Sequence, residues 1–194
     1  MNLGSIIFQG NDEDWLIAAQ IVSGQKELFR LFIKRYERAV YRMGLSFFHN
    51  REDAADFVQE VFLKVYQNLP NFGGRARFST WLYKIAYNTA INKVVRKKEY
   101  QSLIEDELVC DSFTPERKFL LGIARDAILE AIKELPEKFR LCVDLSFFYD
   151  CSYQEIEFIT GFPVNTIKSH VFRAKKLLRE KLSAYAGLDL ERGI

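Results

Sequence analysis

The sequence predicts an all-α protein of two small helical domains, joined by a flexible acidic linker, with a helix-turn-helix in the second domain. Apolar residues recur at three- and four-residue spacings along most of the 194 residues, as they do on one face of a helix. Only 4 Pro and 10 Gly are present, and no run alternates apolar and polar residues as a strand does. The chain is 48% hydrophobic and 28% charged, which supports a packed soluble core and excludes wholesale disorder.

Four helices are expected in the first domain, residues 12–98. The first covers 12–23 and ends at Gly24, and the second is a long helix over 25–48. The third covers 53–69 and is stopped by Pro70. The fourth begins near Ser79 or Thr80, either of which suits a helix N-cap, and continues to about Arg96.

Two of these helices have a predicted buried face. In the first helix, the apolar residues that share one side are Trp15, Leu16, Ala19 and Val22. In the third helix, the apolar stripe consists of Ala54, Val58, Val61, Phe62, Val65 and Leu69.

Residues 99–115 are acidic, weakly periodic and closed by Pro115, so they are the predicted linker. The second domain, residues 116–186, begins with an amphipathic helix that Leu135-Pro136 interrupts, and a helix over 137–148 follows. A short helix over 152–160, a turn at Gly161-Phe162-Pro163 and a last helix over 164–182 form the pattern of a helix-turn-helix.

Charge is distributed in three blocks. Every charge from 73 to 98 is positive, every charge from 99 to 116 is negative, and Glu180 is the one acid between 163 and 181. Two basic blocks that flank an acidic one indicate two polyanion-binding surfaces, although a charge run is often only a solvated face.

The cysteine and histidine content points to a cytoplasmic protein without a metal or other cofactor. Cys110, Cys142 and Cys151 cannot all pair and form no Cys-x-x-Cys motif, so reduced thiols are expected. With His49 and His170 as its histidines, the chain offers little to a Cys/His metal site. Residues 1–10 lack the features of a signal peptide, and no apolar stretch approaches the roughly 20 residues that span a bilayer, so no membrane insertion is expected.

The last helix offers candidates for contact with duplex DNA, because a recognition helix needs groups that bond base edges and cations that reach phosphates. The residues predicted to be exposed are Asn165, Thr166, Lys168, Ser169, His170, Phe172, Arg173 and Lys176. Ile167, Val171, Ala174 and Leu178 fall at core spacings. Any small three-helix bundle with a tight turn resembles this pattern, and His170 alone is equally well read as a solvated residue.

The first domain mixes aromatic residues and cations over 72–88 without an acid. Cations track a phosphate backbone, aromatic faces stack on unpaired bases, and an Asn-bearing helix beside a loop can hold an extruded base by its edge. Trp81 is also compatible with a place in the core, which is the interpretation we favour for Leu82 and Ile85. Asn88 and Asn92 are four residues apart on one helix face and are compatible with ordinary surface positions, but asparagine weakens a helix, which favours a functional role.

Five motifs together resemble the bacterial RNA polymerase sigma factors of the extracytoplasmic function (ECF) group. In order they are residues 53–66 (DAADFVQEVFLKVY), the stretch from Phe72 through RFSTWLYKIAYNTA at 77–90, LPEKFR at 135–140, SYQEI at 152–156 and PVNTIKSHVFRAK at 163–175. The resemblance covers nearly the whole chain. It implies a promoter-specificity subunit, not an enzyme, with region 2 in the first domain and region 4 in the second.

The resemblance also assigns partners to residues. Asp53, Asp56, Gln59, Glu60 and Lys64 match the helix that docks on the beta-prime clamp of core RNA polymerase. For the acids taken alone, without the resemblance, a solvated helix face is the interpretation we favour. The residues that match the loop and helix at the −10 element are Phe72, Gly73, Gly74, Arg75, Arg77, Asn88 and Asn92, and Trp81 and Lys84 complete this candidate surface. The last helix matches the helix that binds the −35 element as duplex DNA. The resemblance further implies contact with the beta flap, a linker in the RNA exit path and an anti-sigma factor.

Two departures from the family pattern prevent a promoter sequence from being inferred. Asn165 stands where the family commonly has Gly, and His170 where it commonly has Arg. The second change removes a bidentate donor to guanine.

Two other classes of function remain open at this point. An autonomous helix-turn-helix regulator would explain the second domain but leaves the aromatic and basic cluster of the first without a task. An enzyme acting on nucleic acid is disfavoured, because the sequence offers no metal cluster, phosphate-cradling loop or nucleophile–base pair.

Overall fold

The computed structural model describes residues 12–101, 128, 131–132 and 134–191, and the regular elements within these ranges are helical. The chain divides into two compact units, Met1–Cys110 and Asp111–Ile194. No helix in these ranges is both long and apolar enough to cross a membrane.

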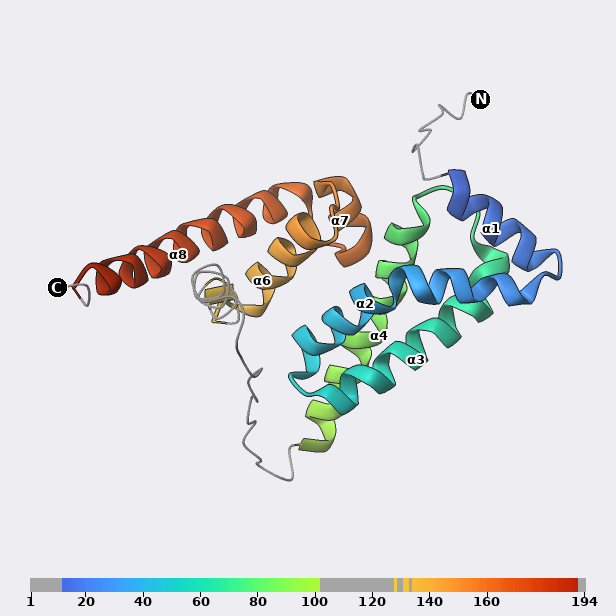
Figure 1. Ribbon diagram of the computed structural model, residues 1–194, viewed down its shortest axis with the longest axis horizontal. Coiled ribbons are helices and arrows are strands. Elements are labelled where there is room, and N and C mark those ends of the chain that lie inside the picture. The colour runs from blue at the N-terminus through green and yellow to red at the C-terminus, as the bar shows by residue number, and fades with distance from the viewer. Residues whose placement is uncertain (1–11, 102–127, 129–130, 133, 192–194) are drawn as a thin grey trace. The chain divides into compact units, whose positions relative to one another are not determined.

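Unit 1 is a helical bundle in which α2 (Phe29–Phe48), α3 (Arg51–Asn68) and α4 (Phe78–Gln101) pack against one another (Figure 1). Two short 3-10 helices, η1 (Lys26–Leu28) and η2 (Leu69–Asn71), precede α2 and follow α3. The side chains of Phe32, Phe57 and Leu82, one from each long helix, are fully buried. The three long helices therefore close one hydrophobic core.

Helix α1 (Asp12–Val22) is attached to α2 by a buried carboxylate. Asp14 is 2% exposed and accepts hydrogen bonds from the guanidinium of Arg35 and the hydroxyl of Tyr36. Burial, and then the hydrogen bond to Asp14, raise the pKa of Tyr36, so the phenol stays protonated and remains a donor.

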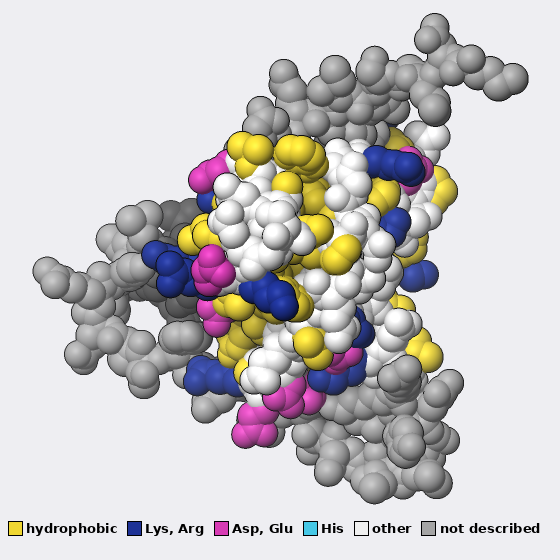
Figure 2. All heavy atoms as spheres, turned by 90° about the vertical axis from the view of Figure 1, so that its right-hand side faces the viewer, with side chains coloured by type: hydrophobic (Ala, Val, Ile, Leu, Met, Phe, Trp, Pro, Cys, Tyr) yellow, Lys and Arg dark blue, Asp and Glu magenta, His cyan; other side chains and the backbone are white. Residues whose placement is uncertain are grey.

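The predicted buried face of α1 is wrong. Ile17, Ala18 and Ile21 are buried beside Asp14, whereas Trp15, Leu16 and Val22 are each about half exposed and Ala19 is exposed. Figure 2 looks onto the side of the molecule that lies on the right in Figure 1, where α1 runs, and shows hydrophobic side chains at the surface there. The ion pair of Asp14 with Arg35 sets the rotation of the helix, which apolar spacing alone does not reveal.

Helices α2 and α3 meet closely at Gly44. A Cβ at this position would lie 2.9 Å from Phe57 Cδ1 and 3.1 Å from Ala54 Cα. Phe57 is fully buried, and Val58, which we predicted in the stripe, is half-buried. The hydrogen bond of 2.7 Å from the Asp53 N–H to Asn50 Oδ1 caps α3, so the helix begins at Arg51 rather than at Asp53.

Helix α4 differs from the expectation at both ends. It begins at Phe78, and Thr80 is not its cap but is 1% exposed inside the helix. The ring of Phe78 stacks on Phe32 with centroids 3.8 Å apart, which fixes the start of α4 on α2. At the other end the helix includes residues 99–101 of the predicted linker, and 102–115 lie outside the described residues.

Unit 2 contains α6 (Glu137–Val143), the π-helical turn η3 (Asp144–Phe148), α7 (Tyr153–Thr160) and α8 (Val164–Glu191). The predicted helix over 137–148 is thus α6 and η3 together, and α8 extends beyond the predicted end at 182. The predicted helix before Leu135 falls mostly outside the described residues. Two of its residues that are described, Ala131 and Ile132, are buried. The core joins Leu135, Val143 and Ala174.

Helices α7 and α8 form the predicted helix-turn-helix. The Ser152 hydroxyl and the Glu155 carboxylate make a reciprocal capping box at the start of α7, and Gly161 ends it with a φ of 78°. Ile156, Ile159, Ile167, Val171 and Ala174 are buried, which confirms the core positions, and Leu178 packs against that core.

Candidate nucleic-acid interface

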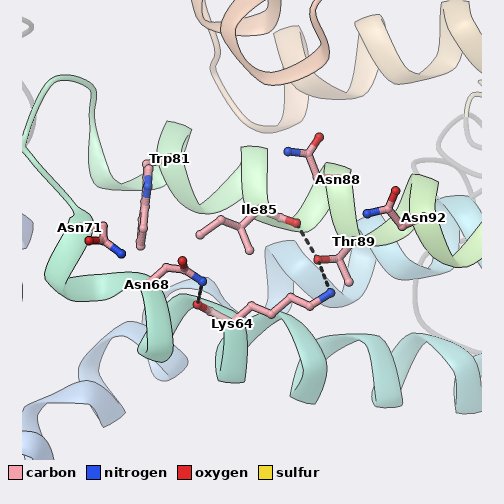
Figure 3. A pocket seen from close by; sticks show the side chains of 8 residues that line it. All are labelled: Lys64, Asn68, Asn71, Trp81, Ile85, Asn88, Thr89 and Asn92. Carbon is pink, nitrogen blue, oxygen red and sulfur yellow. Dashed lines mark hydrogen bonds between the residues drawn. The ribbon is translucent and has the colours of Figure 1, made fainter.

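A pocket of about 300 Å³ lies between α3 and α4 (Figure 3). Its lining consists of Lys64, Asn68, Asn71, Trp81, Ile85, Asn88, Thr89 and Asn92. The volume is at the lower end of the range of about 300–1,000 Å³ that is usual for small-ligand sites. The lining joins an aromatic face, a cation and four side-chain amides, which donate and accept hydrogen bonds. These are the groups that hold an unstacked nucleobase.

Lys64 is a member of this pocket. Its ammonium donates a hydrogen bond to Glu60 Oε1 at 2.7 Å. It also donates to Thr89 Oγ1 at 3.3 Å, and Thr89 in turn donates to the Ile85 carbonyl at 2.8 Å (Figure 3). The sequence placed Lys64 with the polymerase-docking residues of α3. The structure also connects it to α4, because its long side chain reaches across to Thr89 while its ammonium stays paired with Glu60.

Four lining residues were missed by sequence reasoning: Asn68, Asn71, Thr89 and Ile85, the last of which we placed in the core but which is half-buried in the pocket wall. Asn68 follows Lys64 by one helical turn, and its amide donates to the Lys64 carbonyl at 2.8 Å. Asn71 lies in η2, and Thr89 lies between Asn88 and Asn92 on α4 with 3% exposure. The four-residue step from Lys64 to Asn68, matched by the step from Asn88 to Asn92, is the signal that could have found the first of them.

The loop before α4 supplies the other candidates of the first domain. The half-buried ring of Phe72 packs on Trp81, with centroids 5.0 Å apart, and so supports the wall of the pocket. The remaining candidates lie outside the lining. Gly73, Gly74 and Arg75 are exposed, and Arg77 and Lys84 are half-buried.

The outer face of α3 carries the residues predicted to dock on polymerase. Asp56 and Gln59 are exposed, Glu60 is half-buried, and Asp53 is occupied in capping its own helix, where its Oδ2 accepts from Asn50 at 2.8 Å. Leu63, four residues after Gln59, is 57% exposed on the same face. Leu63 makes this face partly apolar. In the sequence, its position as an apolar residue outside the predicted buried stripe was the signal that could have found it.

The outer face of α8 is polar and basic. Asn165, Lys168, Arg173 and Lys176 are exposed, and Phe172 is 71% exposed among them. Thr166 and Ser169, which we predicted to be exposed, are half-buried at the margins of this face. The residue types match major-groove contact, in which an aromatic ring such as that of Phe172 can meet a thymine methyl group.

His170 differs from its predicted exposure. It is half-buried, and its ring lies against Phe139 and Phe162 with centroids 5.2 and 5.8 Å apart. Its Nδ1 is 3.7 Å from the Cys142 Sγ. Burial, and then the charges of Lys138 and Arg173, lower the pKa of His170, while burial raises the pKa of the Cys142 thiol to about 11. The ring is therefore neutral near pH 7 and faces α6.

Comparison with known proteins accounts for both units. Residues 32–100 match the family description Sigma-70 region 2, and residues 125–178 match Sigma-70, region 4. The ECF RNA polymerase sigma-E factor of Escherichia coli K12 is 32% identical over 180 residues, which are 87% of this chain and 94% of the relative. The RNA polymerase sigma-H factor of Pseudomonas aeruginosa is 30% identical over 182 residues, 88% of this chain and 94% of the relative.

The chain belongs to the ECF group of sigma-70 factors.

Two solved structures agree with the fold. This ECF factor is similar to CnrH bound to the cytosolic domain of CnrY, with a TM-score of 0.62, 23% identity, and 87% of this chain and 96% of that one covered. It is also similar to the sigma factor RpoE of Bartonella quintana bound to the anti-sigma factor NepR, with a TM-score of 0.64, 20% identity, and 80% and 96% covered. Region 2 contains the α3/α4 pocket, and region 4 contains the helix-turn-helix. Membership of this family also gives the first domain a role, whereas the hypothesis of an autonomous regulator gave it none.

Proposed function

We propose that this ECF sigma factor directs promoter-specific initiation through three surfaces, one for core RNA polymerase, one for the opened −10 strand and one for the −35 duplex. The observation that carries the proposal is the composition of the α3/α4 pocket, with Trp81 beside Asn88, Asn92 and Lys64. Such a site cannot bind bases within a duplex, because their hydrogen-bonding edges are paired with the other strand and their faces are stacked on neighbouring bases. It fits a protein that acts once the strands part.

The −10 surface consists of the α3/α4 pocket and the loop that leads to it. Trp81 provides a stacking face, the amides of Asn88 and Asn92 read the exposed edge of a base, and Arg75 follows the phosphate backbone. The cations of this surface attract the single strand at any sequence, and the amides select a base.

The polymerase surface is the outer face of α3, where Asp56, Gln59 and Glu60 accompany the exposed Leu63. Acidic and amide groups around one apolar anchor suit a basic helical partner, because charge steers the encounter and Leu63 adds buried area. We propose the beta-prime clamp as this partner, and the beta flap as the partner of region 4.

The −35 surface is the outer face of α8. Lys168, Arg173 and Lys176 reach phosphates, and Asn165 and Phe172 are positioned to meet base edges. We propose that His170 supports this helix from its inner side, since its ring packs on α6.

An inhibitory partner and a cytoplasmic location complete the proposal. The RpoE structure contains the anti-sigma factor NepR. We propose that a regulator of the same kind covers the polymerase and DNA surfaces of this chain, in the compartment where polymerase works.

Run-off transcription from a randomised promoter library tests the function. Core polymerase with this protein should select templates that share two conserved elements at a fixed separation, and core polymerase alone should select none. If the purified protein bound the selected duplex equally well without polymerase, it would be an autonomous regulator. Nuclease activity with a divalent metal would indicate an enzyme.

The proposed domain boundaries have their own test. Residues 99–115 contain no Lys or Arg, so a protease specific for glutamate is the suitable probe. The acidic composition predicts that the first cuts follow Glu105 and Glu107, while Glu155, which is 5% exposed in its capping box, is protected. Early cleavage within α3 or α7 would contradict these boundaries.

A further inference from the structure

Trp15 of α1 lies against the loop that precedes α4. A Cβ built on Gly74 would lie 2.9 Å from Trp15 Nε1 and 3.0 Å from Trp15 Cδ1, and Gly74 has a φ of 66°. A Cβ on the neighbouring Gly73 would meet nothing within 4 Å. The loop therefore passes the indole at one residue, which must be glycine both for its backbone conformation and for the close approach.

Helix α1 holds this indole in a defined place. The residue before Trp15 is Asp14, whose buried carboxylate is bound by Arg35 and Tyr36 of α2. Ile17 and Ala18 are buried just after it. Trp15 itself is 52% exposed, so its place is decided by its neighbours, and its own packing contributes little to the core.

The loop needs such a support. At the start of the loop, the ring of Phe72 packs on Trp81. At its end, the buried ring of Phe78 stacks on Phe32. Between them lie two adjacent glycines, which have the largest conformational freedom of any residues. Trp15 contacts the loop between these two anchors, directly before the cation Arg75.

We propose that Trp15 is a positioning residue for strand capture, which holds the Gly73–Arg77 loop in the conformation that presents Arg75 to the opened −10 strand. The inference rests on the proposed function of region 2. Its physical basis is preorganisation: a loop that is already ordered loses less conformational entropy when DNA binds. Trp15 acts through Gly74 and is not assigned a contact with DNA.

Four variants test the proposal: Trp15→Ala, Trp15→Phe, Gly74→Ala and Leu16→Ala. Hydrogen exchange of the amides of residues 73–77 in the free protein reports the order of the loop. Permanganate reactivity of promoter thymines, with core polymerase present, reports strand opening. A gel shift of the closed complex reports −35 engagement, and circular dichroism confirms folding.

Trp15→Ala and Gly74→Ala should both accelerate exchange in the loop and lower the amount of open complex. We expect the amount of open complex to fall about fivefold to thirtyfold for each loop residue that becomes disordered and must be ordered when DNA binds. Trp15→Phe should retain most of the function, because a ring still covers Gly74. Leu16→Ala, the matched control at an exposed neighbouring position of α1, should behave like the parent protein, and closed complexes should be unchanged throughout.

Different failures have different meanings. If exchange in the loop is unchanged in Trp15→Ala, Trp15 does not hold the loop and the proposal is overturned without reference to DNA. If exchange rises but opening is unaffected, the role in strand capture is overturned. If the parent protein opens no promoter, the proposed function fails and the capture role fails with it, and the exchange data show separately whether Trp15 orders the loop.

Discussion

Lys64 on α3 donates a hydrogen bond of 3.3 Å to Thr89 on α4, a residue 25 positions later in the chain. The same ammonium is paired with Glu60 at 2.7 Å. Glu60 belongs to the proposed polymerase-binding face, and Thr89 belongs to the wall of the α3/α4 pocket. Lys64 therefore lies at the junction of the two surfaces, and the next two predictions separate them.

Lys64→Met should impair promoter opening and leave association with core polymerase nearly unchanged. The substitution keeps the apolar stem but removes the cation from the pocket, and hydrogen bonds to a charged group contribute about 1.5–3 kcal/mol, which corresponds to a loss of more than tenfold. Thr89→Val, which keeps the cation but removes the hydroxyl that accepts from Lys64 and donates to the Ile85 carbonyl, should have a smaller effect. Permanganate footprinting and a core-binding assay measure the two steps. An equal loss of core binding would return Lys64 to the docking surface.

Gln59→Ala combined with Glu60→Ala should abolish association with core polymerase and preserve the fold. Gln59 is exposed, and the Glu60–Lys64 pair, with side chains 40% and 38% exposed, is an i,i+4 surface pair worth only about 0.3–0.5 kcal/mol. Circular dichroism and a core-binding assay check the two expectations. Full binding by the folded double variant would refute the assignment of this face.

The two DNA surfaces should fail at different steps. Lys168→Ala with Arg173→Ala should weaken the closed complex and flatten its salt dependence, by about 0.9 in the logarithmic slope for each phosphate that the protein no longer neutralises. Asn88→Ala with Arg75→Ala should spare the closed complex and reduce opening more than tenfold, since contacts to an unpaired base are worth about 1–3 kcal/mol. Gel shift and permanganate footprinting separate the steps. If both double variants were impaired at the same step, the proposed assignment of the two surfaces to different steps would be wrong.

Gly44→Ala should destabilise unit 1. Alanine is favoured over glycine in a helix by about 1 kcal/mol, but here its Cβ would meet the Ala54 backbone and the buried ring of Phe57 at 3.1 and 2.9 Å. Overpacking of this kind costs about 1–3 kcal/mol, so the net effect is a loss of up to about 2 kcal/mol in the free energy of unfolding. Urea unfolding measures it, with Gly73→Ala as a control at an open position. An unchanged midpoint would mean that α2 and α3 separate easily.

Unit 2 should lose stability as the pH falls below about 6.5, the ordinary pKa of histidine. The folded pKa of His170 is lowered by burial, by Lys138 and by Arg173, so the unfolded chain takes up the proton first and acid favours unfolding. The stabilising contribution is complete above the unfolded pKa and is lost on the way down to the folded one. Denaturant unfolding between pH 5 and 8 tests this, with His170→Gln as the control. If that variant kept the same pH dependence, another group would be responsible.

Local signals in the sequence were sufficient for the helices and their ends in several places. Ser152, Glu155 and Gly161 act within one helix, so the start and end of α7 follow from residues inside it or directly beside it. The buried positions Ile156, Ile167 and Val171 follow from helical periodicity alone. The family resemblance likewise rests on motifs that are contiguous in the chain, and the comparisons confirmed it.

The tertiary structure decided which way particular side chains face. Asp14 pairs with Arg35 across 21 residues and turns Trp15 outward; Lys64 meets Thr89 across 25; and His170 meets Cys142 across 28. In each case a polar or aromatic group could satisfy the local pattern in more than one orientation. The choice was made by a partner on another helix, because burial of a polar group is favourable only where that partner is within bonding distance.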